Sequence, residues 1–198
     1  MKFVLATQNP KKLTEMSAIL SDLGVEVVSE ADLGVKIEVE ETGETFAENS
    51  LLKAKAVMEA TNLPAIADDS GLCVDALNGG PGVYSARFGG EGLDDIGRYR
   101  LLLQMMHGQA DRRAHFHTTI TCAFPNGNIL QNDGDVQGTI AFAPMGENGF
   151  GYDPVFFVPD KRKTFAQLTA EEKAEISHRG KALRAFKETL KNYLAEHQ

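Results

Sequence analysis

The sequence has few cysteines, no long apolar run and no excess of positive charge, and each absence excludes a class of protein. Its two cysteines, Cys73 and Cys122, lie in no C-x-x-C or zinc-like spacing, which favours two reduced, packed thiols over a disulfide or a metal site. The longest apolar runs, such as 101–103, are far too short to span a bilayer. The apolar stretch after Met1-Lys2 is too short for a signal peptide. We therefore expect a cytoplasmic protein with no membrane partner.

The formal net charge of −8 argues against a general nucleic-acid surface, because such a surface needs a basic field to displace counterions. We therefore expect no nucleic-acid partner. A small anionic ligand is compatible with this charge, since local cations and backbone N–H groups can hold phosphates inside an acidic protein. The length of 198 residues suits one domain over 1–198, or two lobes that share one core.

Strand and helix patterns are mixed along the chain, without repeats or linkers, which indicates an α/β fold. We expect a buried strand at 2–6, a helix that stops at Gly24, a short strand at 25–29 and a helix from the capping box Thr45–Glu48 to about Ala60. The other expected elements are a strand at 65–67 that stops at Asp68-Asp69, a helix at 94–106, strands at 115–124, 129–131 and 136–142 with a hairpin turn at Asn126-Gly127, and two C-terminal helices.

The first candidate site follows the first expected strand, at Thr7-Gln8-Asn9-Pro10-Lys11-Lys12. A helix N-terminus offers free N–H groups and a positive dipole end. Thr7 and Asn9 add side-chain donors and Lys12 adds a full charge, so together they could hold phosphate oxygens. The segment is not a Walker A loop, because the G-x-x-x-x-G-K-[ST] pattern is absent. An ordinary capped turn between strand and helix is the alternative interpretation.

Two acidic pairs, Glu40-Glu41 and Asp68-Asp69, are candidates for a metal site. Asp68-Asp69 follows an apolar strand, and open α/β sheets bind ligands where strands end. Carboxylates from separate segments suit Mg²⁺, which prefers oxygen ligands and shares substrate phosphates. Acidic pairs in loops are also typical of solvated surfaces, and we favour that interpretation for Glu41. The apolar and small neighbours of Asp68-Asp69 favour a functional role there.

Asn49 and Lys53 lie four residues apart on the second expected helix and therefore share a face. A cation and an amide at this spacing could serve a polar ligand. Glu48 and Lys55 are close by in the sequence, and the spacing alone favours an exposed polar face.

The segment Gly149-Phe150-Gly151-Tyr152-Asp153-Pro154 combines two glycines with two aromatic rings. Glycine allows close backbone approach. Phe150 or Tyr152 could stack on a base, and backbone groups or Asp153 could hydrogen-bond the edge of that base. A bulge or turn before the apolar residues 155–157 is an equal alternative.

A polar segment, Ser177-His178-Arg179, joins the two C-terminal helices, with Lys173 one turn upstream. Arginine makes bidentate contacts to phosphate or to a base carbonyl, and His178 could donate to a purine oxygen. The alternative is a polar helix junction, which serine commonly caps. A serine hydrolase is excluded, because no G-x-S-x-G motif is present.

Taken in order, these segments resemble the inosine triphosphate pyrophosphatase family, the non-canonical purine NTP (XTP/dITP) diphosphatases, and its bacterial branch in particular. The resemblance covers nearly the whole chain. The matching elements are Thr7-x-Asn9-x-x-Lys12, Glu40-Glu41-Thr42-Gly43, Thr45-Phe46-x-Glu48-Asn49, Ala67-Asp68-Asp69-Ser70-Gly71-Leu72, Pro81-Gly82-x-Tyr84-Ser85-Ala86-Arg87, Phe150-Gly151-Tyr152-Asp153-Pro154 and Ser177-His178-Arg179-Gly180.

The resemblance implies an α/β fold with an elongated mixed sheet flanked by helices, two lobes with the active cleft between them, and a homodimer. It implies Mg²⁺-dependent hydrolysis of ITP, dITP and XTP to the monophosphate and pyrophosphate. Asp69 is expected as general base and, with Glu40, as a metal ligand, and Asp68 is a further candidate ligand beside it. The expected substrate-binding residues are Thr7, Asn9, Lys12, Lys53, Ser70, Phe150, Gly151, Tyr152, Asp153, Lys173, His178 and Arg179.

Three alternative functions stay open at this point. One is a pyrophosphatase for other modified nucleotides, such as modified pyrimidines, or for canonical ones. Another is a non-catalytic nucleotide sensor, although an intact carboxylate pair argues against it because a pure binder has less need of a base beside a metal site. The third, an RNA-binding module, is disfavoured by the net charge and by the lack of a basic stripe.

Overall fold

The computed structural model describes residues 1–7, 9–90 and 92–197. Its strands are β1 (Lys2–Leu5), β2 (Glu26–Ser29), β3 (Ala65–Val74), β4 (Arg113–Ala123), β5 (Ile129–Ile140), β6 (Phe156–Val158) and β7 (Lys163–Thr164). Its α-helices are α1 (Pro10–Leu20), α2 (Phe46–Thr61), α3 (Asp95–Met105), α4 (Ala170–Ile176) and α5 (His178–Glu196). Among these described helices, none combines the length and the apolar character that crossing a membrane requires.

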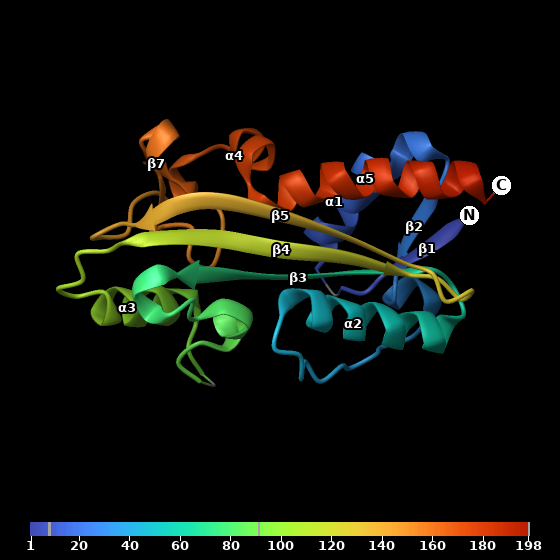
Figure 1. Ribbon diagram of the computed structural model, residues 1–198, viewed down its shortest axis with the longest axis horizontal. Helices are drawn as coiled ribbons and strands as arrows, with labels where there is room; N and C mark the ends of the chain where they lie inside the picture. Colours follow the sequence, from blue (N-terminus) through green and yellow to red (C-terminus); the bar gives the residue numbers. More distant parts are fainter. Residues whose placement is uncertain (8, 91, 198) are drawn as a thin grey trace. The chain divides into compact units, whose positions relative to one another are not determined.

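All the strands form one sheet in the order β2-β1-β3-β4-β5-β6-β7 (Figure 1). β1 pairs in parallel with β2 and with β3, whereas β6 is antiparallel to β5 and to β7. The sheet is therefore mixed and flanked by helices, which confirms the predicted α/β class.

The chain divides into two compact units. Unit 1 comprises Met1–Asp69, Thr118–Gly134 and Lys181–Gln198, and unit 2 comprises Ser70–His117 and Asp135–Gly180. The strands β3, β4 and β5 and the helix α5 each contribute residues to both units.

The core of unit 1 has two layers because successive side chains of a strand point to opposite faces of the sheet. Ile66 of β3 packs in one cluster with Met16 of α1 and Phe186 of α5. Its neighbour Ala67 packs instead with Ala54 of α2. Thus α1 and α5 cover one face of β3, and α2 covers the other (Figure 1).

Unit 2 is built around aromatic packing on β4 and β6. Phe116 of β4 stacks on Phe165, with ring centroids 5.8 Å apart, and meets Phe156 of β6 edge-on. Leu72 of β3 and Leu102 of α3 complete this cluster. The geometry is that of favourable aromatic pairs, which add to the free energy gained by burying apolar area.

Several local predictions are confirmed. Gly24 ends the first helical stretch with φ +66°, and Thr45 and Glu48 form the complete capping box that begins α2. The hairpin between β4 and β5 turns at Asn126-Gly127, where Gly127 has φ +88°. These features depend on residues close together in the sequence, which is why the sequence predicts them.

Two strand predictions are wrong. β3 does not stop at Asp68-Asp69 but continues to Val74, because Leu72 and Val74 are fully buried. The two aspartates are tolerated within the strand because each is paired with a lysine from a helix. β5 is one strand rather than two separate ones. The middle of β5 is polar and mostly exposed, so the alternation of apolar and polar residues in the sequence predicts two short strands on either side of it.

Candidate functional site

The topology of unit 1 contains a point at which open α/β sheets commonly bind ligands. β1 lies between the parallel strands β2 and β3, with α1 following β1 on one face and α2 preceding β3 on the other. Such a reversal of strand order is a topological switch point, and open α/β sheets bind ligands outside the carboxyl ends of the strands there. β3 pairs with β1 only as far as Leu5 and Ile66. Asp68 and Asp69 therefore lie beyond the carboxyl end of β1.

Asp68 is held by the opening turn and α1. The Nζ of Lys12 donates to Asp68 Oδ2 at 2.7 Å, and the aspartate side chain is almost fully buried. In the turn itself, the backbone N–H of Asn9 donates to Thr7 Oγ1 at 3.2 Å. Gln8, in the predicted phosphate-binding turn, lies outside the described residues. The turn thus brings one of its predicted phosphate ligands, Lys12, into a buried ion pair.

Thr7 and Asn9 line a hollow of about 480 Å³ beside that turn. Its other described lining residues are Leu13, Ser29, Glu30, Ala31, Val35 and Lys36. The hollow lies at the carboxyl ends of β1 and β2, beside the positive dipole end of α1. Two of the three predicted phosphate ligands therefore face a common space, while Lys12 faces Asp68.

Asp69 points to the opposite face of the sheet from Asp68 and is held by α2. Lys53 Nζ lies 3.1 Å from Asp69 Oδ1 and 2.7 Å from Glu41 Oε1. Gly43 lets the segment carrying Glu41 approach α2 closely, since its N–H donates to Asn49 Oδ1 and a Cβ there would lie 2.7 Å from the same oxygen. One lysine thus joins two carboxylates from separate segments.

Burial and charge set the ionisation of this group. Burial raises the pKa of Asp69, the Lys53 ammonium opposes it, and the charge of Glu41 adds to the rise, so the pKa stays above its usual range. Burial alone would lower the pKa of Lys53, but Asp69 and Glu41 outweigh it and raise that pKa. A buried carboxylate with a raised pKa is a better general base than an ordinary aspartate.

One oxygen of Asp69 is left for a ligand. Oδ2 is buried without a hydrogen-bond partner in the described structure, as is Nδ2 of Asn49. The Asn49 side chain lies close enough to lower the pKa of Asp69 by hydrogen bonding, although its Nδ2 does not reach Asp69 Oδ2 with good hydrogen-bond geometry among the described residues. A buried, unsatisfied carboxylate oxygen is costly unless something binds it. This oxygen is the strongest structural sign of a binding function in unit 1.

Two sequence interpretations are corrected here. Asn49 and Lys53 do not form an exposed polar face, because Asn49 is 0% exposed and Lys53 is paired with two acids. Glu41 is not solvated surface, since its carboxylate accepts from Lys53. The sequence does contain a sign that this side of α2 is packed, because Ala54 and Val57 are apolar residues at helical spacing. Both are buried in the structure.

The predicted metal ligands do not form a ready-made cluster. No three histidine, cysteine or acidic side chains in the described ranges converge as a metal site would require. Glu40 is exposed, and Asp68 and Asp69 point to opposite faces. Mg²⁺ commonly takes only one or two carboxylates, with waters and substrate phosphates as its other ligands. Asp69 with its unpartnered oxygen, and the Glu40-Glu41 segment, fit that requirement.

The predicted base site lies on a loop of unit 2. Phe150 is 70% exposed, whereas Tyr152 is 5% exposed and its hydroxyl donates to Ser85 O at 2.6 Å. Phe150 is therefore available for stacking and Tyr152 is not. Gly149 has φ +78°, and a Cβ there would collide with the carboxylate of Asp153, so this position requires glycine.

Lys173 of α4 contacts this loop through Asp153 and Phe150. The Lys173 ammonium pairs with Asp153 Oδ2, which also accepts from the N–H of Phe150 at 2.9 Å. Lys173 Nζ lies 4.8 Å from the centroid of the Phe150 ring, within the range of a cation–π contact. Burial raises the pKa of Asp153 and Lys173 opposes it, leaving the pKa above its usual range. Three of the predicted site residues are therefore in direct contact.

The remaining predicted residues lie at the start of α5 and on β3. Ser177 Oγ accepts from the N–H of Gly180, so this serine caps α5 as expected for a helix junction. The ring of His178 stacks on Phe116 at 4.8 Å, and Arg179 is half-buried beside it in the chain. Ser70 follows Asp69 on β3 and is half-buried.

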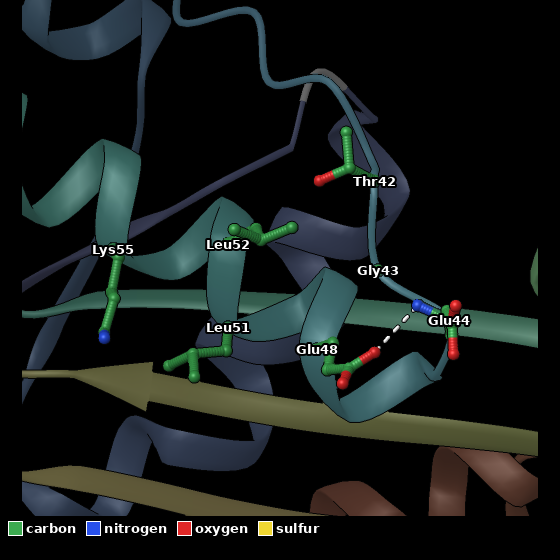
Figure 2. A pocket seen from close by; sticks show the side chains of 7 residues that line it. All are labelled: Thr42, Gly43, Glu44, Glu48, Leu51, Leu52 and Lys55. Carbon is green, nitrogen blue, oxygen red and sulfur yellow. Dashed lines mark hydrogen bonds between the residues drawn. The ribbon is translucent and has the colours of Figure 1, made fainter.

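A second hollow, of about 370 Å³, contains none of the predicted site residues. It is lined by Thr42, Gly43, Glu44, Glu48, Leu51, Leu52 and Lys55 (Figure 2). Glu44 donates its N–H to Glu48 Oε2 at 2.7 Å, which ties the loop to the first turn of α2. Residues 48, 51, 52 and 55 form one face of α2, next to the face that carries Asn49 and Lys53. The hollow is therefore separate from the Lys53 contacts.

Known proteins resemble this chain along almost its full length. A model of the Ham1 family matches residues 3–189. A dITP/XTP pyrophosphatase of Thermus thermophilus is 51% identical over 193 residues, or 97% of this chain and 93% of that protein. One from Escherichia coli is 48% identical over 195 residues, or 96% and 98%. The Ham1 protein structure of Staphylococcus aureus is 42% identical with a TM-score of 0.92, covering 98% and 100%. The chain therefore belongs to the Ham1 family.

Proposed function

We propose that the chain hydrolyses the non-canonical purine triphosphates ITP, dITP and XTP to the monophosphate and pyrophosphate, with Mg²⁺ as cofactor. The relatives named dITP/XTP pyrophosphatases, similar over nearly the whole chain, support this reaction. The single observation in the molecule that carries it is the buried Asp69 carboxylate, which Lys53 fixes at one oxygen and which has no hydrogen-bond partner among the described residues at the other.

Asp69 is the proposed general base. It takes a proton from a water whose oxygen bonds to the α-phosphorus, while the bond from that phosphorus to the bridging oxygen breaks and pyrophosphate leaves with the electron pair. Its raised pKa favours proton transfer from water at neutral pH. Lys53 fixes the orientation of the carboxylate, and positioning of this kind is a large part of phosphoryl-transfer catalysis.

Asp69, Glu41 and Glu40 are the proposed holders of Mg²⁺. The unpartnered oxygen of Asp69 and the nearby acids supply the hard oxygen ligands this ion prefers. When bound, Mg²⁺ supplies positive charge to the phosphates and acidifies a bound water. Asp68 is assigned a different role, which is to hold the ammonium of Lys12 in place.

The triphosphate is assigned to Thr7, Asn9, Lys12 and Lys53. Thr7 and Asn9 face the hollow beside the opening turn, and the N-terminus of α1 begins directly after it. The positive end of a helix dipole favours a phosphate at this position. The lysines add charge that offsets the negative charge of the leaving group.

The base is assigned to residues of unit 2. Phe150 offers an exposed ring for stacking, with the Lys173–Asp153 ion pair beside it. His178 and Arg179 can donate to the 6-oxo group of hypoxanthine or xanthine, whereas adenine presents an amino donor at that position. A site that depends on such hydrogen bonds rejects a mismatched base because buried polar groups lose their partners. Ser70, Gly151 and Tyr152 are assigned to the walls of the two sites rather than to catalysis.

A substrate panel tests this function. Pyrophosphate release is measured for ITP, dITP and XTP, for ATP and GTP, and for modified pyrimidine triphosphates, with Mg²⁺ or with a chelator. We expect kcat/KM for ITP to exceed that for ATP by about 10⁴-fold, with loss of turnover in the chelator. Equal rates for ATP and ITP contradict the assigned selectivity. Tight nucleotide binding without turnover identifies a sensor, and preference for a pyrimidine identifies a different pyrophosphatase.

A further inference from the structure

The loop that carries Phe150 is fastened at successive residues by groups outside the predicted site. The N–H of Gly151 donates to Asp95 Oδ2 of α3 at 2.8 Å, across 56 positions of sequence. The hydroxyl of Tyr152 donates to Ser85 O. Fixing a loop to two distant elements in this way restricts its conformation more than its own turn could.

Asp95 is free for this contact because its neighbour does the capping. Asp94 is the N-cap of α3, and its Oδ1 accepts from the N–H of Gly97 at 2.7 Å. Asp95 follows in the first helical turn, where its contact with Arg98 is long, at 3.4 Å. The hydrogen bond from Gly151 to an ionised carboxylate is of the stronger, charge-assisted kind. Of these two adjacent aspartates, Asp94 therefore caps α3 and Asp95 accepts the hydrogen bond from Gly151.

The loop needs such a restraint. Phe150 is 70% exposed, and its ring lies against the Lys173 ammonium, 4.8 Å from the ring centroid, rather than in the core. Gly151 has φ +61°, and in the described part of the chain no atom lies within 4 Å of where its Cβ would be, so the backbone after Phe150 borders open space. The carbonyl of the Phe150–Gly151 peptide accepts from the N–H of Asp153 at 3.2 Å within the loop, and the N–H of the same peptide donates to Asp95, which ties the peptide to α3.

We propose that Asp95 is a positioning residue for the purine base. By holding the Gly151 amide, it keeps the Phe150 ring in the orientation that stacks on the base, without touching the substrate itself. This role rests on the proposed function, because it requires Phe150 to bind a base. It predicts that loss of Asp95 weakens base binding while leaving the chemical step at Asp69 intact.

The two neighbouring aspartates supply a matched pair of variants. For Asp95→Ala we expect KM for dITP to rise about tenfold, the effect of losing one hydrogen bond to a charged group, with kcat within about twofold of wild type. The ratio of kcat/KM between dITP and dATP falls as well. For Asp94→Ala we expect a lower melting temperature from the lost cap, with KM unchanged. Asp95→Asn keeps an acceptor oxygen, so its KM for dITP should be close to that of the wild type.

A second measurement needs no turnover. In NMR spectra of the isotope-labelled protein without nucleotide, the Gly151 amide should shift and exchange faster with solvent in Asp95→Ala, and not in Asp94→Ala. A wild-type KM and base preference in Asp95→Ala, or equal KM changes in both variants, overturns the positioning role. If the wild-type protein does not hydrolyse dITP, the proposed function fails, and the Gly151 amide still reports whether Asp95 holds the loop.

Discussion

The two units hold their candidate groups by different means. In unit 1, Asp68 and Asp69 lie within a strand, and each is paired with a lysine from a helix. In unit 2, Phe150 lies on a loop that is held by hydrogen bonds to other elements. Side chains on strands and helices are positioned more precisely than side chains on loops. Catalysis requires this precision, because a small displacement of a reacting group lowers the reaction rate strongly. We therefore expect changes in unit 1 to lower kcat and changes in the loop to alter KM and base preference.

The largest expected effect is that of Asp69→Asn. The amide cannot take the proton from water, so kcat should fall by roughly 10²-fold or more, the usual scale for loss of a general base. The loss should be similar for every nucleotide substrate, since we propose that the purine base binds to residues of unit 2 and not to Asp69. Steady-state kinetics with ITP, dITP and XTP check this prediction.

Asp68→Asn is the matched control, one residue along the same strand. Asp68 contacts Lys12 and points away from Lys53, so this change should act mainly on KM through the displaced ammonium. Equal losses of kcat in the two variants would mean that the pair acts as one acidic unit. A near-normal kcat for Asp69→Asn would remove Asp69 from the role of base.

A smaller effect is expected for Phe150→Ala. Stacking of a base on an aromatic ring contributes about 1–3 kcal/mol, so KM for dITP should rise about tenfold with little change in kcat. The melting temperature should hardly change, because the ring is mostly exposed. Phe142→Ala is the control, since Phe142 is 84% exposed and contacts Arg112 rather than Lys173. Equal changes in KM for both variants would argue against stacking at Phe150.

The smallest effect concerns the single cysteine of each unit. Burial, with Asp135 and Asp75, raises the pKa of Cys73 in unit 2 to about 11, so at mildly alkaline pH its reactive thiolate should be about 100-fold scarcer than in an ordinary thiol. Burial also raises the pKa of Cys122, which is 0% exposed in the core of unit 1. Alkylation followed by mass spectrometry should label Cys73 slowly and Cys122 only on unfolding. Rapid labelling of Cys122 would show that the core of unit 1 opens.

Features set by neighbouring residues could be predicted from the sequence. The capping box of α2, the stop at Gly24 and the turn at Asn126-Gly127 are examples. Asp69 could also be singled out in this way, since an acidic pair after an apolar strand is an unusual local pattern.

Contacts across the fold could not be predicted in this way. Phe150 and Tyr152 are both aromatic residues of one short segment, but Tyr152 is buried because its ring packs in the core of unit 2 and its hydroxyl donates to the distant carbonyl of Ser85. Glu41 has the sequence pattern of a surface acid because its partner Lys53 lies on another element. The local sequence also does not tell which of Asp68 and Asp69 faces α1 and which faces α2, because that depends on where the two helices pack on the sheet.

Turnover of dITP in water labelled with the heavy oxygen isotope tests the central claim most directly. If Asp69 delivers a water to the α-phosphorus, mass spectrometry should find one heavy oxygen in the dIMP and none in the pyrophosphate. Heavy oxygen in the pyrophosphate, or release of inorganic phosphate with dIDP, would place the attack at another phosphorus and contradict the mechanism.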